Sequence, residues 1–497
     1  MMAHLALRNL GHRPWRTALL LLGYGIGVAV MIVLLSIGEA LITQARDERL
    51  VGGGEITVLP EGLDVEVMKT GGVGGLFFSI DHARFVYLQL LAAPRLASDV
   101  RAVAPQIEGK LLYLRAKGRE TPVRATGELP SATRAVGAAP TLAAGSWDDD
   151  AGDRRWAEPT PAELRHDIDH FHLPPPGVAN RESWAEWHYF NVLSSDRRRW
   201  AFVSFIVAGD VPNGRWGAQV LVTTHEQGGG ARRFSALVPP ERVRFSTTDA
   251  DVVIGPSSMT VLPDGRYAVR ARAAEEGGAG ARLALDLVVT PAARAYFPGA
   301  TLASGDFVSG YAVPALRADA TGTLCVGGRC ERLEGVQAYH DHNWGVWRGV
   351  SWEWGAARAG DFTLLYGRVQ PPDSLETSSP LFLCVVDSLG FRALFRPQRI
   401  VYEDGRTIVI GGRPVRVPSR AVMEDSRGAD TLRVEVAVED AAGTDTRRPL
   451  AERGESGAAR RLARPYFIQM KGRARLTGRL DGRPMRGDGA GFFETYR

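Results

Sequence analysis

The sequence lacks an excess of either charge. Its 497 residues include 60 Lys or Arg and 56 Asp or Glu, which leaves a net charge of +4. The basic residues are scattered along the chain, so no basic stripe indicates a nucleic-acid partner. A chain of this length exceeds a single hydrophobic core, and its 45% apolar residues are enough to fill several. We therefore expect two to four folded domains that do not bind nucleic acid.

Cysteine is also scarce, with three residues in the chain. Cys325 and Cys330 lie symmetrically outside a Gly-Gly turn, which is typical of a β-hairpin. If Val326 and Arg329 beside the turn form a hydrogen-bonded pair, the cysteines form the next pair, whose close Cα atoms suit a disulfide in an oxidising compartment. Two unrelated free thiols are the alternative. Cys384 lies in an apolar run and is expected in the core.

Long uncharged runs are absent except for one near the amino terminus. Residues 17–38 carry no charge and are mostly Leu, Val, Ile, Ala and Gly, over the length that a membrane-spanning helix requires. Arg8, Arg13 and Arg16 precede this run and charges of both signs follow it, so the positive-inside bias predicts a cytoplasmic amino end. A cleaved signal peptide is the alternative, but the run is longer than usual for one and no clear cleavage site follows. We predict a single-pass protein of the inner membrane whose bulk is periplasmic.

The first part of the chain resembles ABC-transporter permeases of the MacB, FtsX and LolC kind. The resemblance rests on residues 5–10, 13–17, 52–58 and 103–107. It implies a cytoplasmic amphipathic segment (1–16), a transmembrane helix (17–38) and a small α+β extracytoplasmic core domain (39–157), after which we expect a linker (158–182). The three further membrane helices of such permeases are absent, so we do not expect a complete permease subunit.

From residue 183 onward the sequence is typical of β-structure. Short apolar-polar alternations, such as residues 199–208 and 282–290, are separated by Gly, Pro, Asn and Asp turns. Strands spaced in this way without intervening helices predict antiparallel barrels or sandwiches. No internal repeat is visible, yet the number of strands suggests two β modules, which we place at residues 183–338 and 339–497.

A segment before the strands is rich in metal-ligating residue types. It contains His166, Asp167, Asp169, His170 and His172, followed by three prolines that predict an extended exit. No second His/acid cluster shares its spacing. We therefore expect a solvated segment rather than a metal site.

The central motif, residues 339–345 with the sequence Tyr-His-Asp-His-Asn-Trp-Gly, crowds ionisable and aromatic side chains into one predicted strand. Because Asp341 and the histidines at 340 and 342 alternate, they point to opposite faces, and we expect no metal site made of these three neighbours. Alternation places Tyr339, Asp341 and Asn343 on one face and His340, His342 and Trp344 on the other.

A second aromatic run follows, in which alternation places Trp352 and Trp354 on one face and Glu353 on the other. A carboxyl group enclosed by indoles loses hydration of its charged form, which raises its pKa and lets it act as a general acid. Aromatic faces also stabilise a carbocation on an apolar ligand. Asp341 with Tyr339 therefore suits protonation of an alkene. The alternative is structural: the polar groups satisfy backbone atoms and the indoles pack.

The same residues resemble a lipocalin-like family that unites AttH proteins, carotenoid 1,2-hydratases (CrtC) and certain fungal pericyclases. The resemblance covers residues 165–497 and rests on residues 186–191, 310–311, the central motif and residues 491–496. It implies a mainly β fold of two tandem lipocalin-like antiparallel β-barrels with a ligand pocket, and it gives Tyr339 and Asp341 an acid/base role. The expected ligand-binding residues are His340, His342, Asn343, Trp344, Trp352, Glu353, Trp354, Trp187, Tyr189, Tyr311 and Glu494.

Three functions are consistent with these features. The first is a membrane-anchored protein that binds an apolar, isoprenoid-like or lipid ligand as an accessory to an ABC export system, with its permease and ATPase as partners. The second is a hydro-lyase or cyclase that protonates a polyene, as the resemblance to carotenoid 1,2-hydratases implies. The third is a structural fusion without a ligand. None of them calls for a cofactor.

Overall fold

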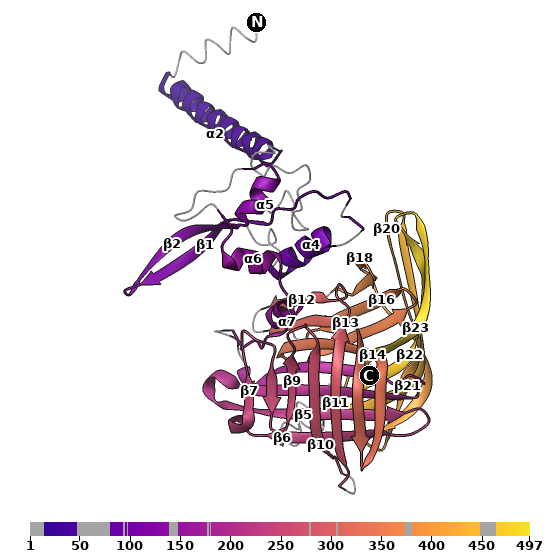
Figure 1. The fold of residues 1–497 in the computed structure, drawn as a ribbon. Coiled ribbons are helices and arrows are strands. Elements are labelled where there is room, and N and C mark those ends of the chain that lie inside the picture. Colours follow the sequence, from indigo (N-terminus) through magenta and orange to yellow (C-terminus); the bar gives the residue numbers. More distant parts are fainter. Residues whose placement is uncertain are drawn as a thin grey trace. The chain divides into compact units, whose positions relative to one another are not determined.

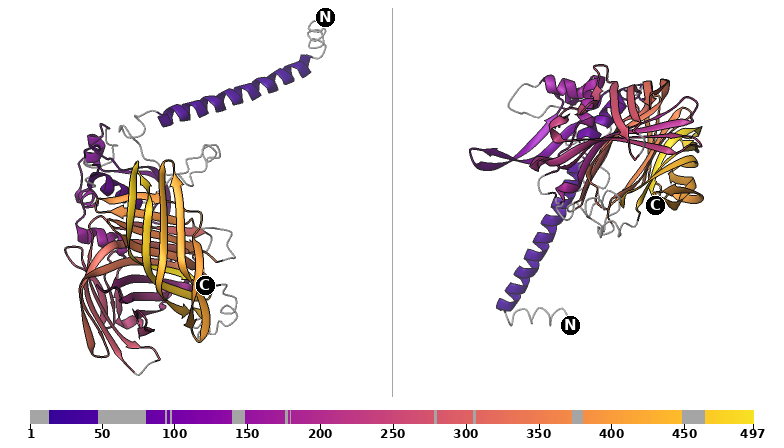
Figure 2. Two further views of the ribbon diagram at one scale, coloured as in Figure 1. Left: turned by 90° about the vertical axis from the view of Figure 1, so that its right-hand side faces the viewer. Right: turned by 90° about the horizontal axis from the view of Figure 1, so that it is seen from below.

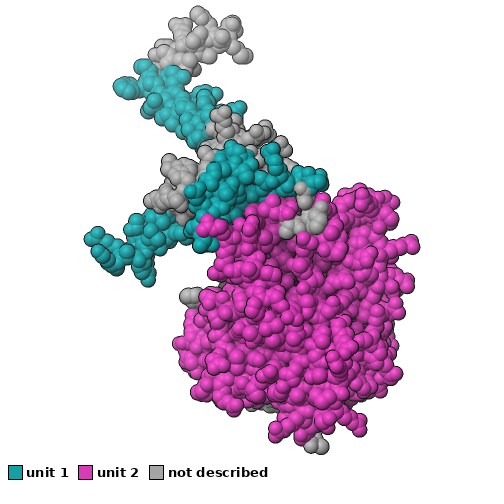
Figure 3. Space-filling model, in the orientation of Figure 1, with its two compact units in different colours: residues 1–83, 98–153 teal, residues 84–97, 154–497 magenta. Residues whose placement is uncertain are grey.

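The computed structural model describes residues 14–46, 80–92, 95–96, 98–138, 148–175, 178, 180–277, 280–304, 307–372, 380–447 and 464–497. The chain forms two compact units, residues 1–83 with 98–153, and residues 84–97 with 154–497 (Figure 3). Two stretches of the permease-like pattern, residues 5–10 and 52–58, lie outside the described residues.

The first unit contains a long helix and a hairpin. Helix α2 (Pro14–Arg46) includes an apolar stretch, Pro14–Glu39, with a mean hydropathy of 2.6. By length and composition this stretch suits a membrane anchor, and a signal sequence would have the same properties. Strands β1 (Gln106–Ala116) and β2 (Arg119–Glu128) pair as an antiparallel hairpin, followed by α5 (Pro130–Ala135).

The second unit begins with helical segments that precede two large sheets. They are α4 (Ile80–Ala92, in this unit from Arg84), α6 (Ala151–Ala157, from Arg154) and α7 (Pro161–Asp169). Helix α7 starts with a capping box in which the Thr160 hydroxyl accepts from the Glu163 backbone and the Glu163 carboxylate accepts from the Thr160 backbone. The chain then leaves α7 after Asp169, and Phe171 packs into the core of the first sheet.

The first sheet has twelve strands among the described residues and contains a closed barrel. The order β11-β13-β14-β3-β4-β5-β6-β10 returns to β11 by the β10–β11 pairing, which makes a ring of eight antiparallel strands (Figure 1). The strands are β3 (Trp184–Leu193), β4 (Arg199–Asp210), β5 (Arg215–Glu226), β6 (Ala231–Val238), β7 (Val243–Phe245), β8 (Val252–Ile254), β9 (Ser257–Val261), β10 (Tyr267–Glu275), β11 (Arg282–Pro291), β12 (Phe297–Ser304), β13 (Phe307–Val326) and β14 (Arg329–Val346). At the β13–β14 turn, Cys325 and Cys330 pair across the strands and form a disulfide.

The second sheet, drawn in orange to yellow in Figure 2, has nine strands among the described residues. Its end strands β18 and β19 are not paired with each other in the part of the chain that the structure describes. Their order is β18-β17-β16-β15-β23-β22-β21-β20-β19. The strands are β15 (Ser351–Ala359), β16 (Phe362–Gln370), β17 (Phe382–Asp387), β18 (Gly390–Phe395), β19 (Val401–Ile410), β20 (Arg413–Arg427), β21 (Asp430–Asp445), β22 (Tyr466–Leu480) and β23 (Arg483–Tyr496).

The prediction of a mainly β chain with two antiparallel modules is confirmed, with a half-barrel as the second module. The change from one sheet to the next falls between Val346 and Ser351 rather than at residue 338. The central motif therefore belongs to the first sheet, whereas the predicted bounds place it in the second. Strand β14 is unusually long, at 18 residues, and the motif lies in its carboxyl-terminal half.

Three apolar layers hold the second unit together. One fills the barrel, one lines the half-barrel, and the third lies between the sheets. The layer between the sheets takes side chains from β3 and β14 on one side and from β15 and β23 on the other, for example Tyr189 and Phe492. Each large apolar side chain buried in this way stabilises the fold by roughly 1.5–3 kcal/mol. As a result, β3 and β14 are buried on both faces over most of the motif.

Substitution of Gly310 tests how tightly β13 packs on β14. A Cβ at Gly310 would lie 2.2 Å from Trp344 Cε2, closer than packed atoms approach. We expect Gly310→Ala to reduce the free energy of unfolding by about 1–3 kcal/mol, because the indole must shift. Urea denaturation followed by tryptophan fluorescence measures this change. Gly230→Ala, where a Cβ would meet no atom within 4 Å, is the matched control; equal stability of both variants would contradict the packing described.

Candidate functional site

Strand β14 presents different chemistry on its two faces. Tyr339 lies in the layer between the sheets together with Trp354. His340 lies inside the barrel, where its ring stacks on Phe190 with centroids 3.9 Å apart. The predicted separation of Asp341 from the neighbouring histidines is therefore confirmed, and each face forms a site of its own.

The first site lies between the sheets. We call Tyr339, Asp341, Asn343, Trp354 and Glu494 the acid site. Trp354 Nε1 donates to Tyr339 Oη at 2.8 Å, and Tyr339 Oη donates to Asp341 Oδ2 at 2.8 Å. Asn343 Nδ2 donates to Asp341 Oδ1 at 2.7 Å. Both oxygens of the Asp341 carboxyl group are thus held in fixed directions.

Two buried carboxyl groups occur in the acid site. Burial and the negative charge of Glu494 raise the pKa of Asp341 to about 8, against the opposing effect of the hydrogen bonds from Tyr339 and Asn343. Burial also raises the pKa of Glu494, which accepts a hydrogen bond from Trp352 Nε1 at 2.9 Å. Burial and the charge of Asp341 raise the pKa of Tyr339. At neutral pH, Asp341 therefore holds a proton that it can donate.

Aromatic side chains enclose the acid site. Tyr311 meets Trp354 edge to face, with ring centroids 4.9 Å apart. Trp347 lies against both Trp187 and Trp352, at centroid distances of 4.6 and 5.5 Å. These last three indoles are only half-buried, so they are the part of the aromatic wall nearest to solvent.

Two cavities lie away from the acid site. One of about 440 Å³ is lined by residues of β4, β5 and β6, including Leu237. Another of about 410 Å³ lies beside Trp200, His225 and Cys330. Asp341, in contrast, is 3% exposed and in contact with its neighbours. A ligand therefore reaches Asp341 only if aromatic side chains of the wall move.

The structure separates the predicted ligand-binding residues. His340, His342 and Trp344 lie on the barrel face of β14, where Trp344 stacks on His172 with centroids 3.6 Å apart. Glu353 lies beside Arg368, whose Nε donates to it at 2.8 Å. Strand alternation turns these residues away from Asp341. The predicted residues on the side of the acid site are Asn343, Trp352, Trp354, Trp187, Tyr189, Tyr311 and Glu494.

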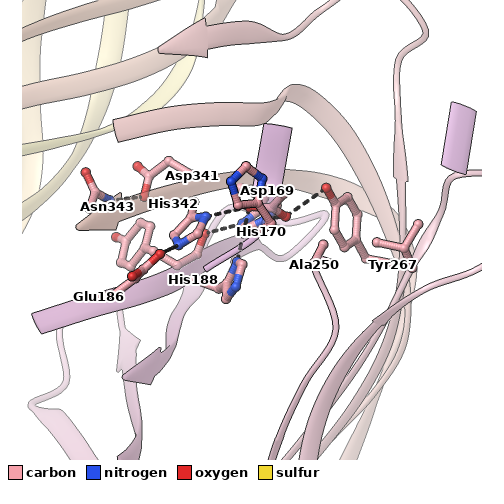
Figure 4. Close-up of polar contacts among 12 residues, drawn as sticks. Asp169, His170, Glu186, His188, Ala250, Tyr267, Asp341, His342 and Asn343 are labelled. Carbon is pink, nitrogen blue, oxygen red and sulfur yellow. Dashed lines mark hydrogen bonds and ion pairs between the residues drawn. The ribbon is translucent and has the colours of Figure 1, made fainter. Parts of the chain in front are cut away.

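The second site is a group of ionisable side chains inside the barrel, part of which Figure 4 shows. His340 Nε2 lies 2.8 Å from Asp169 Oδ2, and His342 Nε2 lies 2.8 Å from Glu186 Oε1. Asp169 Oδ1 lies 3.2 Å from His188 Nδ1 and 3.1 Å from His342 Nδ1. We call this group the histidine cluster; its members are Asp169, His172, Glu186, His188, His340 and His342.

Charge pairing accounts for the burial of the histidine cluster. Burial alone would lower the pKa of His342, but hydrogen bonds to Asp169 and Glu186 outweigh it and raise the pKa to about 9. Burial alone would raise the pKa of Asp169, and the nearby His340 holds it well below its usual range. Burial, followed by the charge of His342, lowers the pKa of His188 to about 4.

The expectation that residues 166–172 form a solvated segment is wrong for Asp169 and Phe171, which are 0% and 2% exposed. The end of α7 brings Asp169 to His188 of β3 and His340 of β14, which are distant in sequence. The β3–β14 register pairs His188 with His342, and this pairing depends on long-range strand order. The sequence does show that His340 and His342 point to the same face of the strand, and this predicts a shared acidic partner on that face.

The fold defines a mainly β protein in which a closed eight-stranded barrel is joined to a half-barrel, with one long apolar helix before them among the described residues. Solved structures similar to this chain include AttH from Nitrosomonas europaea, with 16% identity and a TM-score of 0.43 over 66% of this chain and 98% of that chain. CghA in complex with Sch210972 has 15% identity and a TM-score of 0.42, over 66% of this chain and 97% of that one. Kievitone hydratase from Nectria haematococca has 13% identity and a TM-score of 0.38, over 66% and 96%. No family model and no curated relative matches the chain.

Glu494 provides a pH-dependent test of the acid site. Because its pKa is raised in the folded state, its contribution to stability is complete below the ordinary carboxyl pKa and is lost as the pH rises through the raised value. We expect Glu494→Gln to lose less stability between pH 5 and pH 8 than the wild type, as measured by urea denaturation at each pH. Glu334→Gln removes an exposed carboxyl and controls for the lost charge. A steeper loss in Glu494→Gln would contradict the assignment.

Proposed function

We propose that this protein is an acid–base catalyst that protonates a carbon–carbon double bond of an apolar ligand. The observation that carries the proposal is the buried carboxyl–phenol pair of Asp341 and Tyr339, hydrogen-bonded at 2.8 Å and enclosed by aromatic rings. Such surroundings favour a neutral acid and an apolar ligand together. The reaction class is that of a hydro-lyase or cyclase.

The chemistry would proceed in two proton transfers. The Asp341 O–H bond breaks as a C–H bond forms on the alkene, which leaves a carbocation and the Asp341 carboxylate. The aromatic faces near Asp341 stabilise this cation. In hydration, water adds to the cation and one of its protons is transferred to the carboxylate. In cyclisation, a second double bond attacks the cation, and the carboxylate then removes a proton from a carbon next to the new cation. Either route regenerates the acid. Tyr339 and Asn343 position the carboxyl group through their hydrogen bonds.

A second candidate is a binding protein without turnover. Helix α2, with its stretch of high hydropathy, supports a location at a membrane, where apolar ligands dissolve. A tethered module with an aromatic interior would then hold such a ligand for another protein. The accessory role beside an ABC permease and ATPase stays a prediction, as does a structural fusion without a ligand.

Turnover distinguishes the two candidates. We expect purified full-length protein, given lycopene in detergent micelles in D₂O, to form products with deuterium bound to carbon, detected by mass spectrometry. Asp341→Asn removes the acid and should lower this rate by about 10²-fold or more. Tyr339→Phe removes one hydrogen bond and should lower it by about tenfold.

Glu353→Gln is the matched control, because it replaces another buried carboxyl that faces Arg368 instead of the acid site. It should leave the rate unchanged. Native mass spectrometry of protein isolated from membrane-containing cells reports on binding. Each apolar ligand recovered in this way is then tested for deuterium incorporation by the wild type. A ligand that is retained, with no incorporation into any ligand tested, would favour the binding protein and contradict the enzyme.

A further inference from the structure

The histidine cluster takes no part in the chemistry proposed for the acid site, yet it is more deeply buried. Asp169, His188, His340 and His342 have no exposed surface, and Glu186 is 1% exposed. Placing so many ionisable groups in a barrel is unfavourable unless each is paired. The contacts within the cluster pair these groups but leave His188 Nε2 without a partner among the described residues.

His340 has an orientation typical of a metal ligand. Its Nδ1 lies 3.0 Å from the Tyr189 carbonyl oxygen, which only accepts, so Nδ1 carries the hydrogen. In the neutral ring, Nε2 then presents a lone pair to Asp169 Oδ2 at 2.8 Å. Two lone pairs at this distance repel each other unless a proton lies between them or the two atoms move slightly apart to bind one metal ion. A backbone carbonyl that fixes the tautomer in this way is the usual outer partner of a ligating histidine.

His188 provides the second, independent observation. Its Nε2 has no hydrogen-bond partner among the described residues. His188 Nδ1 nevertheless points toward Asp169, at 3.2 Å. Buried polar atoms without partners are rare in folded proteins and call for a bound species.

We propose that Asp169, His188 and His340 bind a divalent transition-metal ion such as Zn²⁺. One ligand atom from each residue lies within 4.8 Å of the other two, so a single ion placed between them can contact all three. Two imidazoles with one carboxylate suit zinc and its neighbours rather than Mg²⁺ or Ca²⁺. The Tyr267 hydroxyl donates to Asp169 Oδ2 at 3.0 Å and orients this carboxylate from outside.

The position of the site favours a structural role. Asp169 ends α7, whereas His188 and His340 come from the adjacent strands β3 and β14. An ion bound to all three would link α7 to the two strands that are buried on both faces. Three protein ligands leave a fourth coordination position open, but complete burial keeps a substrate away from it.

Metal analysis of the full-length protein tests the proposal. We expect about one equivalent of metal per chain by mass spectrometry of the elements, and Co²⁺ added after chelation should give the visible absorption of a nitrogen- and oxygen-ligated site. His188→Gln and His340→Gln should each weaken Co²⁺ binding by 10²-fold or more, because a ligand is lost. Tyr267→Phe should weaken it by about tenfold, because only the outer hydrogen bond is lost.

His166→Gln is the matched control. His166 belongs to a more exposed group with Asp249 and Asp251 that offers a competing surface site. Loss of Co²⁺ binding in this variant, with binding kept in His188→Gln, overturns the proposal. So does wild-type protein that takes up no Co²⁺ and keeps its melting temperature when Zn²⁺ is added, since the cluster is then held by imidazolium–carboxylate pairs. The measurements on the wild type test the proposal even if a histidine variant does not fold.

Discussion

The chemistry proposed for this protein depends on β14 being buried on both faces. A strand with one face in solvent can point its charged groups outward, but Tyr339 to His342 have no such direction available. Each ionisable side chain must therefore lose its charge or acquire a partner. The two faces meet this requirement in different ways.

Between the sheets, the requirement is met by protonation. Asp341 and Glu494 have no cationic side chain among their described hydrogen-bond partners, which are phenol, amide and indole groups. A carboxyl group in such surroundings keeps its proton to a higher pH than usual, and this makes it a competent acid. Inside the barrel, the requirement is met by pairing, since four imidazoles approach two carboxylates. Even if no metal ion binds, that face cannot serve as a proton donor of the same kind, because its carboxylate Asp169 is held ionised.

Local rules predicted the acid site and missed the histidine cluster. The period of two along a strand sufficed to place Tyr339 beside Asp341, because both residues are on one strand two positions apart. Glu494 reaches the site through the β15–β23 pairing opposite Trp354, and only its place in a family-like motif indicated it. Asp169 is the last residue of α7 and meets His340 of β14 across 171 residues, so no local pattern connects the two. The predicted module boundary at residue 338 differs from the structure for a related reason. The motif resembles the start of a strand in the sequence, whereas β14 begins earlier, at the hairpin turn.

The two sites share the backbone of β14, so the fixed positions of the histidine rings affect the geometry of the acid site. Asp341 is flanked by His340 and His342, whose rings are fixed against Phe190 and His188. A strand held from the barrel side has little freedom to rotate or slip, since a shift by one residue would exchange its two faces. The distance between the Tyr339 hydroxyl and the Asp341 carboxyl is therefore set partly by contacts on the opposite face. A general acid that is positioned before its ligand arrives requires less rearrangement during reaction, which is where preorganised sites gain rate. On this reasoning, the contacts of the histidine cluster help to hold β14 in the register that places Tyr339 beside Asp341.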